Sequence, residues 1–288
     1  MKTQTRNQYR ATDLRSVTPA SPEAPLHHKT LVVVPTFNEA ENIESVLTRI
    51  RCEAPWVEIV VIDDSSPDGT AALAQQVADE LGQIAVLSGG TKSGLGTAYR
   101  TGFAYGLERG HQVLVEMDAD LSHDPAALPA LLDAVEQGAD LAIGSRYIAG
   151  ASIPHWPARR RALSRVGNAY AAFMLRVPAT DLTSGYRAYR ADALRAASFQ
   201  TTTATGYAFQ IEMASRVAQA GGAITEVPIV FTDRVHGSSK MSARITVEAL
   251  LLVTRWGVQH RFAGVDRRDH VRDHVRDHEG DHEGGRGR

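Results

Sequence analysis

Two aspartates, Asp118 and Asp120, follow the apolar run 113–117 with a single alanine between them. Such a run is typical of a buried strand, which would carry both carboxylates to its carboxyl end. Side chains alternate along an extended backbone, so a bend after Met117 is needed for both to approach one ion. A divalent metal held by two carboxylates takes its other ligands from phosphate oxygens. We therefore predict a metal and diphosphate site here; the alternative is that the aspartates merely precede the helix that begins at Pro125.

Five apolar runs alternate with four segments of helical periodicity, and this order predicts the fold. In residues 40–52, for example, Ile43, Val46, Leu47 and Ile50 share one helical face. Strands that alternate with helices form a doubly wound α/β sheet through right-handed connections, and ligands bind at the carboxyl ends of its strands. The expected strands are 30–35, 57–62, 84–87, 113–117 and 140–144, and the expected helices are 40–52, 70–81, one that ends at 107, and 126–137.

The loop at residues 63–70 is acidic and follows the second predicted strand. A carboxylate only accepts hydrogen bonds, so Asp63 or Asp64 suits the ring N–H groups of a nucleobase or the hydroxyls of a ribose. An equally good interpretation is structural: Asp63 or Asp64 ends the strand, and Asp68 caps the next helix. The glycine-rich segment 89–96 fits neither a P-loop nor a dinucleotide fingerprint, because its glycines have the wrong spacing.

The chain changes in character after the fifth predicted strand. Residues 155–161 gather three arginines beside Trp156 and lead into a helix, 162–175, with an apolar stripe. Such a helix suits a membrane surface with anionic headgroups, although a core helix with a solvated basic end is the simpler interpretation. A second long helix, 244–262, is too short and too charged to span a bilayer; it either lies in the interface or packs on the sheet.

The composition limits the classes of protein that this chain can form. At 288 residues and 43% hydrophobic content, it can bury one substantial core, and we expect a single α/β domain over residues 29–262. A formal charge of -2 gives no general attraction to nucleic acid. Cys52 is the single cysteine, which excludes an internal disulfide and favours a reducing cytoplasm. No apolar run reaches the roughly 18 residues of a membrane span, so we expect a soluble or peripheral protein.

Both ends of the chain differ from this domain. Residues 1–28 are basic and lack a sustained apolar period, so we expect a disordered arm. Residues 263–288 form a low-complexity tail of arginine, aspartate and histidine. Its histidines recur every four residues and would share one face of a helix, where they could bind Zn²⁺ or Ni²⁺; a disordered mixed-charge tail is the simpler interpretation.

Five short motifs in order resemble those of the dolichyl- or polyprenyl-phosphate mannose synthases, family-two inverting glycosyltransferases of the GT-A fold. The resemblance covers about residues 30–262. Each motif is weak by itself, whereas five in this order are specific. They are residues 34–39 (VPTFNE), 63–70 (DDSSPDGT), 117–121 (MDADL), 144–147 (GSRY) and 237–240 (GSSK).

The resemblance implies a GT-A, Rossmann-like, mostly parallel sheet and a set of site residues. It implies that Pro35, Phe37, Glu39, Ile62 and Asp64 surround the guanosine. It implies that Asp118, Ala119 and Asp120 hold the diphosphate and a Mg²⁺ or Mn²⁺ ion, with Ser122 at the position where relatives often have a glutamine as a further metal ligand. It implies that Arg146, Arg160, Ser164, Arg234 and Lys240 gather around the reacting phosphates, with Arg146 counted as catalytic beside the aspartate pair.

The resemblance also implies the reaction, which is transfer of mannose from GDP-mannose to a polyprenyl monophosphate with inversion. A lipid monophosphate is already anionic near neutral pH, so no serine, cysteine or histidine has to be activated as a nucleophile. Metal and arginines would instead neutralise two negatively charged partners. We expect the enzyme at the cytoplasmic face of a membrane as a peripheral protein. Two alternatives stay open: a glucosyltransferase that uses UDP-glucose or another UDP-sugar, and a non-catalytic nucleotide-sugar-binding protein.

Overall fold

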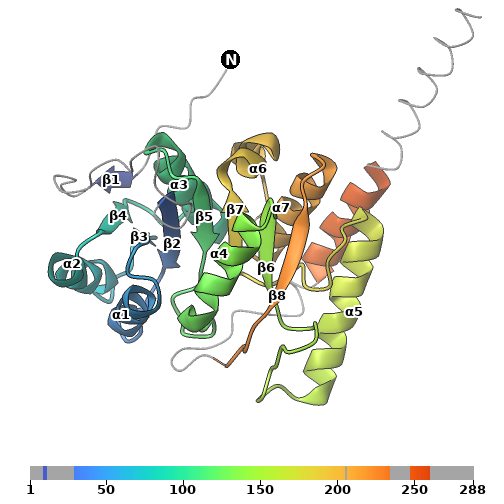
Figure 1. The fold of residues 1–288 in the computed structure, drawn as a ribbon, viewed down its shortest axis with the longest axis horizontal. Helices are drawn as coiled ribbons and strands as arrows, with labels where there is room; N and C mark the ends of the chain where they lie inside the picture. The colour runs from blue at the N-terminus through green and yellow to red at the C-terminus, as the bar shows by residue number, and fades with distance from the viewer. Residues whose placement is uncertain (1–8, 12–28, 205, 234–246, 260–288) are drawn as a thin grey trace, which may run out of the picture.

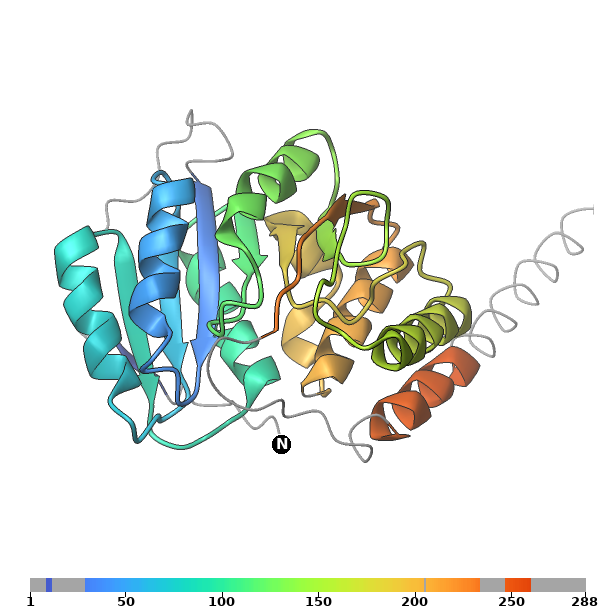
Figure 2. The ribbon, with the colours of Figure 1, turned by 90° about the horizontal axis from the view of Figure 1, so that it is seen from below.

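The computed structural model describes residues 9–11, 29–204, 206–233 and 247–259. These residues form an eight-stranded sheet with helices on both faces (Figures 1 and 2), in the strand order β1-β4-β3-β2-β5-β7-β6-β8. The strands are β1 (Tyr9–Ala11), β2 (Thr30–Thr36), β3 (Glu58–Asp63), β4 (Ile84–Gly89), β5 (Val113–Glu116), β6 (Leu141–Ser145), β7 (Arg187–Arg190) and β8 (Ile224–Pro228). The helices are α1 (Ile43–Glu53), α2 (Thr70–Leu81), α3 (Leu95–Glu108), α4 (Leu128–Glu136), α5 (Ala158–Leu175), α6 (Ala191–Ala196), α7 (Tyr207–Gln219) and residues 247–259, with short 3-10 turns at Pro125–Ala127 and Phe199–Thr201.

The five strands of the predicted doubly wound unit are all present and run in one direction. β4, β3, β2 and β5 pair in parallel, and β6 shares their direction because both β5 and β6 are antiparallel to β7. The β2–β3 pairing continues to Thr36 and Asp63, so these two strands end level with each other. The predicted mostly parallel α/β sheet is confirmed, and its strand ends bring the candidate site residues to one edge.

Strand β7 is not among the strands that the sequence predicted. Arg187 opens the strand fully buried and lies opposite Glu116 of β5. Its guanidinium donates to the main-chain carbonyls of Leu182, Ser184 and Gln210 at 2.6–2.8 Å. Burial raises the pKa of Glu116 to about 8, while the attraction of Arg187 opposes that rise. A strand that buries an arginine in this way carries no apolar alternation, so its sequence gives no sign of it.

The N-terminal strand β1 was not predicted either. Residues 9–11 lie within the segment that was expected to be disordered, and they pair antiparallel with β4 at the edge of the sheet. The remainder of residues 1–28 and the tail 263–288 lie outside the described residues, as do Arg234 and Lys240.

The core forms two layers, one on each face of the sheet. Helices α1, α2 and α4 cover one face, and α3, α6 and α7 cover the other (Figure 2). Helix α3 lies close to the strands because two of its positions on the sheet side are glycines, one turn apart. A Cβ at Gly102 would overlap Val33 of β2, and one at Gly106 would lie 2.7 Å from Leu31. This close approach places the N-terminal part of α3, with Tyr99, against the end of β5.

Helix α5 turns its apolar stripe away from the core. Its fully buried positions are Asn168, Ala171 and Leu175, whereas the predicted stripe includes Leu163 and Phe173, which are 66% and 70% exposed. The 247–259 helix lies beside α5 in both views (Figures 1 and 2), with the Tyr170 hydroxyl 2.7 Å from the hydroxyl of Thr254. None of the helices in the described part of the chain is both long and apolar enough to cross a membrane.

Candidate active site

A cavity of about 380 Å³ lies beyond the carboxyl ends of β5 and β6. The loop after β5 contributes Asp118, Asp120 and Ser122, and the loop after β6 contributes Arg146. α5 adds Arg160 and Ser164, together with apolar side chains. The cavity therefore brings together most of the described residues that were predicted to hold the diphosphate, the metal and the reacting phosphates. The exception is Ala119, which is buried and does not line it.

The aspartate pair lies on a bent segment, as the alternation of side chains required. β5 ends at Glu116, the backbone bends over residues 119–121, and Leu121 adopts a left-handed conformation with φ 60°. This bend lets both Asp118 and Asp120 line the cavity. The Tyr99 hydroxyl donates to Asp118 Oδ1 at 3.2 Å. Burial, followed by the negative charge of Asp118, raises the pKa of Tyr99 well above its usual value, so the hydroxyl remains a donor.

These residues fit a hard divalent cation. Asp118 is about one-third exposed and Asp120 is buried, and both present carboxylate oxygens, which Mg²⁺ and Mn²⁺ prefer. Within the described residues no cluster of three or more histidine, cysteine or acidic side chains forms a complete cage. An ion here would therefore take further ligands from substrate oxygens. Ser122 donates to Asp120 Oδ1 through its amide at 3.1 Å and its hydroxyl at 2.6 Å, so it orients that carboxylate; its role as a metal ligand stays a prediction.

His123 also belongs to this site, although it was not among the residues predicted from the sequence. The ring is buried, stacks on Tyr186 with 5.3 Å between ring centroids, and meets Phe231 edge-on. Its Nδ1 lies 3.8 Å from Oδ2 of Asp118. The position of His123, three residues after Asp120, was the only signal in the sequence, and a single histidine there does not indicate a contact with aspartate.

Arg146 is held firmly at the edge of the cavity. Its Nε and Nη2 each donate to one carboxylate oxygen of Asp181 at 2.7 Å, and both side chains are buried. Burial favours the neutral form of each group, but their mutual attraction outweighs it, so the pKa of Arg146 is raised and the pKa of Asp181 is lowered. Both groups are therefore charged at neutral pH, and a permanent cation lies in a protected position beside the aspartate pair.

Arg160 is held more loosely at the rim. Its guanidinium lies over the ring of Trp156 at 3.8 Å and donates to Asp233 at 3.3 Å. Both partners of this ion pair are almost half exposed. Nearby, Ser164 accepts a hydrogen bond of 2.6 Å from the Tyr147 hydroxyl. Arg160 and Ser164 thus line the cavity as predicted, but through side chains that can exchange partners more easily than Arg146.

The predicted guanosine residues form a separate group at the ends of β2 and β3. Pro35 and Ile62 are register partners in adjacent strands, and the Lys92 ammonium lies over the Phe37 ring at 3.4 Å from its centroid. Glu39 accepts from the Asn42 side chain at 2.8 Å. None of these residues lines the cavity, so their role toward a nucleotide stays a prediction.

The aspartates of the acidic loop 63–70 make two kinds of hydrogen bond. Some stay near the loop itself, and others join it to the glycine-rich segment. Asp63 ends β3 as the structural interpretation expected, and it accepts from Thr36 and Ser66. Asp68 accepts from the amide and hydroxyl of Thr70, but the N-cap residue of α2 is Gly69 and not Asp68. Asp64 is different because it reaches across to residues 93–94. Its two oxygens accept from the amide and hydroxyl of Ser93 at 2.6 and 2.8 Å and from the amide of Gly94 at 2.8 Å. A nucleotide that binds Asp64 has to share this carboxylate with the loop.

Fold and site together define a class of protein. Residues 31–197 match the model of glycosyl transferase family 2, and the chain belongs to that family. It is therefore a glycosyltransferase.

Two curated relatives are similar over most of their length. Polyprenol monophosphomannose synthase of Mycolicibacterium smegmatis is 47% identical over 234 residues, which cover 81% of this chain and 88% of that protein. Undecaprenyl-phosphate mannosyltransferase of Micrococcus luteus is 48% identical over 240 residues, which cover 83% of this chain and 98% of that protein.

Solved structures support the fold. The crystal structure of glucosyl-3-phosphoglycerate synthase from Mycobacterium tuberculosis with Mn²⁺, UDP and phosphoglyceric acid matches with a TM-score of 0.59 and 21% identity, covering 80% of this chain and 81% of that one. Its complex with phosphoglyceric acid gives a TM-score of 0.58 at the same identity. Such a likeness shows the fold alone, and it agrees with the predicted GT-A type.

Proposed function

We propose that this glycosyltransferase transfers mannose from GDP-mannose to a polyprenyl monophosphate, with inversion at the anomeric carbon. The products are polyprenyl phosphate β-mannose and GDP. The names of the two relatives at 47% and 48% identity support mannose as the sugar and a polyprenyl phosphate as the acceptor. GDP as the nucleotide is an inference from the resemblance of the sequence motifs.

The observation that carries this proposal is the composition of the cavity along its length. Acidic and basic side chains line the part beside the strand ends, with Asp118 and Arg146 among them. Apolar side chains line the part between α5 and the 247–259 helix, including Leu163, Leu250 and Val253. A phosphate joined to a long apolar chain is likewise charged at one end and apolar along the rest of its length. A wholly polar acceptor would leave the apolar part of the cavity without a complementary group.

The chemistry follows from the charges of the two substrates. An oxygen of the lipid phosphate attacks the anomeric carbon of mannose, the bond from that carbon to the donor diphosphate breaks, and GDP leaves with the electron pair. Because the attacking phosphate is already anionic, this step needs no proton acceptor. Arg146 and Arg160 would bind phosphate oxygens and reduce the repulsion between the two anions. Asp118 and Asp120 would hold Mg²⁺ or Mn²⁺, which supplies positive charge to the departing diphosphate.

We also propose that the protein lies on a membrane surface through α5 and the 247–259 helix. Leu163, Val166 and Phe173 on α5 and Leu251 on the neighbouring helix are each at least 66% exposed. Three exposed arginines, Arg159–Arg161, begin α5 and suit anionic headgroups. The same helices line the cavity, so a lipid in the membrane would reach the site along them. Placement at the cytoplasmic face stays a prediction.

The decisive experiment supplies the purified protein with polyprenyl phosphate and either radiolabelled GDP-mannose or radiolabelled UDP-glucose. We expect a labelled product that partitions into organic solvent with GDP-mannose and little with UDP-glucose. Preference for UDP-glucose would replace the proposal with the glucosyltransferase alternative. Transfer to water-soluble phosphate esters in place of the lipid would contradict the acceptor.

A further inference from the structure

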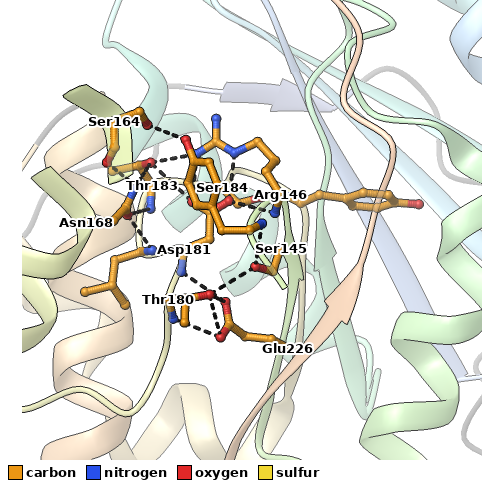
Figure 3. Close-up of polar contacts among 12 residues, drawn as sticks. Ser145, Arg146, Ser164, Asn168, Thr180, Asp181, Thr183, Ser184 and Glu226 are labelled. Carbon is orange, nitrogen blue, oxygen red and sulfur yellow. Dashed lines mark hydrogen bonds and ion pairs between the residues drawn. The ribbon is translucent and has the colours of Figure 1, made fainter. Parts of the chain in front are cut away.

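The Arg146 guanidinium is oriented by a neighbour from a different part of the chain, as Figure 3 shows. Asp181 accepts from Arg146 Nε and Nη2 at 2.7 Å, and also from the Arg146 amide at 3.0 Å. Nη2 donates a further hydrogen bond of 2.7 Å to the Thr183 hydroxyl. Among the described residues Nη1 has no such partner. Because Arg146 lines the cavity, Nη1 can contact a molecule bound there. The two-point contact fixes the plane of the guanidinium, because rotating it would break one of two short bonds.

Asp181 is in turn held by a carboxylate on the edge strand β8. Glu226 accepts from the Asp181 amide at 3.0 Å and from the amide and hydroxyl of Thr180 at 2.8 Å (Figure 3). On the other side, the Asn168 side chain of α5 accepts from the amides of Leu182 and Thr183 at 2.7 and 3.2 Å. The turn at residues 180–183 is thus tied to both β8 and α5. Its aspartate has little freedom to move with respect to the cavity.

The burial of this pair indicates orientation rather than stability as its role. The side chains of Arg146 and Asp181 are 6% and 0% exposed. Removing two charges from water costs about as much as their attraction returns, so such a pair is a poor way to stabilise a fold. It is an effective way to hold one cation in one direction, because few water molecules compete for either partner.

We propose that Asp181 is a positioning residue for the transfer reaction. It aligns Arg146 so that Nη1 meets the reacting phosphate oxygens, and Glu226 holds Asp181 in place through the backbone of residues 180–181. This inference rests on the proposed function, because it requires a phosphate in the cavity. Asp181 itself does not contact the substrate.

The primary test is a double-mutant cycle on lipid-dependent activity with Arg146→Lys, Asp181→Asn and both substitutions together. We expect Asp181→Asn to lower kcat/KM for polyprenyl phosphate by about 100-fold, as a misplaced catalytic group does, and to leave KM for GDP-mannose nearly unchanged. Asp181 is proposed to act only through Arg146. The double variant should therefore lose no more activity than the less active of the two single variants. Losses that multiply in the double variant would overturn the inference.

Two further variants separate positioning from folding. Glu226→Gln leaves the ion pair intact and loosens only its support, so we expect a smaller loss of the same kind, with KM for the lipid raised. Asp140→Asn is the matched control, since Asp140 lies directly before β6 and pairs at 3.7 Å with Arg190, the last residue of β7, at the end of these strands away from the cavity. It should leave lipid dependence unchanged. Equal losses in Asp140→Asn and Glu226→Gln would overturn the inference.

Chemical rescue provides an independent readout if Asp181→Asn folds poorly. Added guanidinium ion should restore part of the activity of Arg146→Ala, because Asp181 can bind the free cation, and should restore none in Arg146→Ala/Asp181→Asn. Equal rescue of both would contradict the positioning role. Wild-type protein is assayed alongside: if it makes no lipid product, the proposed function fails, whereas an active wild type with an unaffected Asp181→Asn contradicts only this inference.

Discussion

The two aspartates after β5 differ in how the fold holds them. Asp118 is partly exposed and accepts from Tyr99, whereas Asp120 is buried and fixed by two hydrogen bonds from Ser122. Asparagine at position 120 keeps an oxygen that can accept both of these bonds. It removes the negative charge and replaces the other oxygen with an NH2 group, and a divalent ion depends on both the charge and the oxygen.

We therefore expect Asp120→Asn to lower turnover by at least about 100-fold while the free energy of unfolding changes by about 1 kcal/mol or less. Activity titrated with Mn²⁺ and urea unfolding of the same preparation measure the two effects. Asp133→Asn, at an exposed position on α4, is the control and should change neither. Undiminished activity in Asp120→Asn, or full wild-type activity in excess chelator, would exclude the metal assignment.

Two roles for Arg160 lead to different expectations: a surface ion pair with Asp233, or a contact with the substrate phosphate. Its pair with Asp233 is exposed on both sides, and such pairs contribute little to stability. Loss of one charge-assisted contact to a phosphate corresponds to about 10-fold to 100-fold in affinity. We predict that Arg160→Ala raises KM for polyprenyl phosphate by this factor and leaves KM for GDP-mannose nearly unchanged.

Steady-state kinetics with varied lipid and fixed donor decide the matter. Arg195→Ala on α6 is the matched control, because Arg195 also forms an exposed pair with one aspartate but lies outside the cavity. An unchanged lipid dependence in Arg160→Ala would place the acceptor phosphate elsewhere.

The Asp181 carboxylate also predicts a pH dependence of stability. Its pKa is lowered in the folded state, because the attraction of Arg146 outweighs burial. The stability that it contributes is therefore fully present above the unfolded aspartate pKa of about 3.9 and is lost as the pH falls through the lower folded pKa. Asp181→Asn has no such carboxylate, so the difference in unfolding free energy between wild type and variant should shrink below about pH 4. Urea unfolding from pH 3 to pH 7 measures this difference, and a constant gap would contradict it.

Among the elements, α3 shows most clearly how packing against the sheet depends on glycine. Gly102 lies where any Cβ would overlap Val33, so the helix could accommodate one only by moving off the sheet. Because α3 also carries Tyr99, which contacts Asp118, a shift of the helix would be felt in the site.

We expect Gly102→Ala to lower the free energy of unfolding by about 1–3 kcal/mol through overpacking. Gly167→Ala is the matched control. Gly167 is also in a helix, but a Cβ there meets nothing within 4 Å, so alanine should raise stability by up to about 1 kcal/mol through helix propensity. Thermal or urea unfolding of both variants tests the prediction, and equal effects would show that close packing of α3 is unimportant.

At the scale of the whole molecule, we test the proposal that the exposed faces of α5 and the 247–259 helix bind a membrane surface. Leu251→Glu places a charge in the apolar face and should reduce cosedimentation with phosphatidylcholine vesicles that contain phosphatidylglycerol. Leu73→Glu is the control, because Leu73 is also exposed but lies on α2, away from both helices. Equal binding of both variants would exclude this face as the membrane-binding surface.

The sequence by itself determined the features that depend on local pattern and chain order. Apolar runs that alternate with helical segments require parallel strands, and parallel strands carry whatever follows them to one edge of the sheet. That is why the pattern alone placed Asp118 and Asp120 at a strand end, whereas the resemblance of the motifs to a known family implied that Arg146 belongs to the same site.

Only the tertiary structure decided which distant residues complete that site and which faces stay exposed. Asp181 lies 35 residues from Arg146, and their contact depends on how the turn before β7 packs against β6 and β8. Strand β7 was not predicted because its first residue, Arg187, is charged. Main-chain carbonyls accept hydrogen bonds from this arginine, which allows it to be buried. An apolar stripe such as that of α5 is the same in sequence whether it faces the core or solvent. Contacts of this kind arise from register and packing between segments far apart in the chain, which no local pattern of residues encodes.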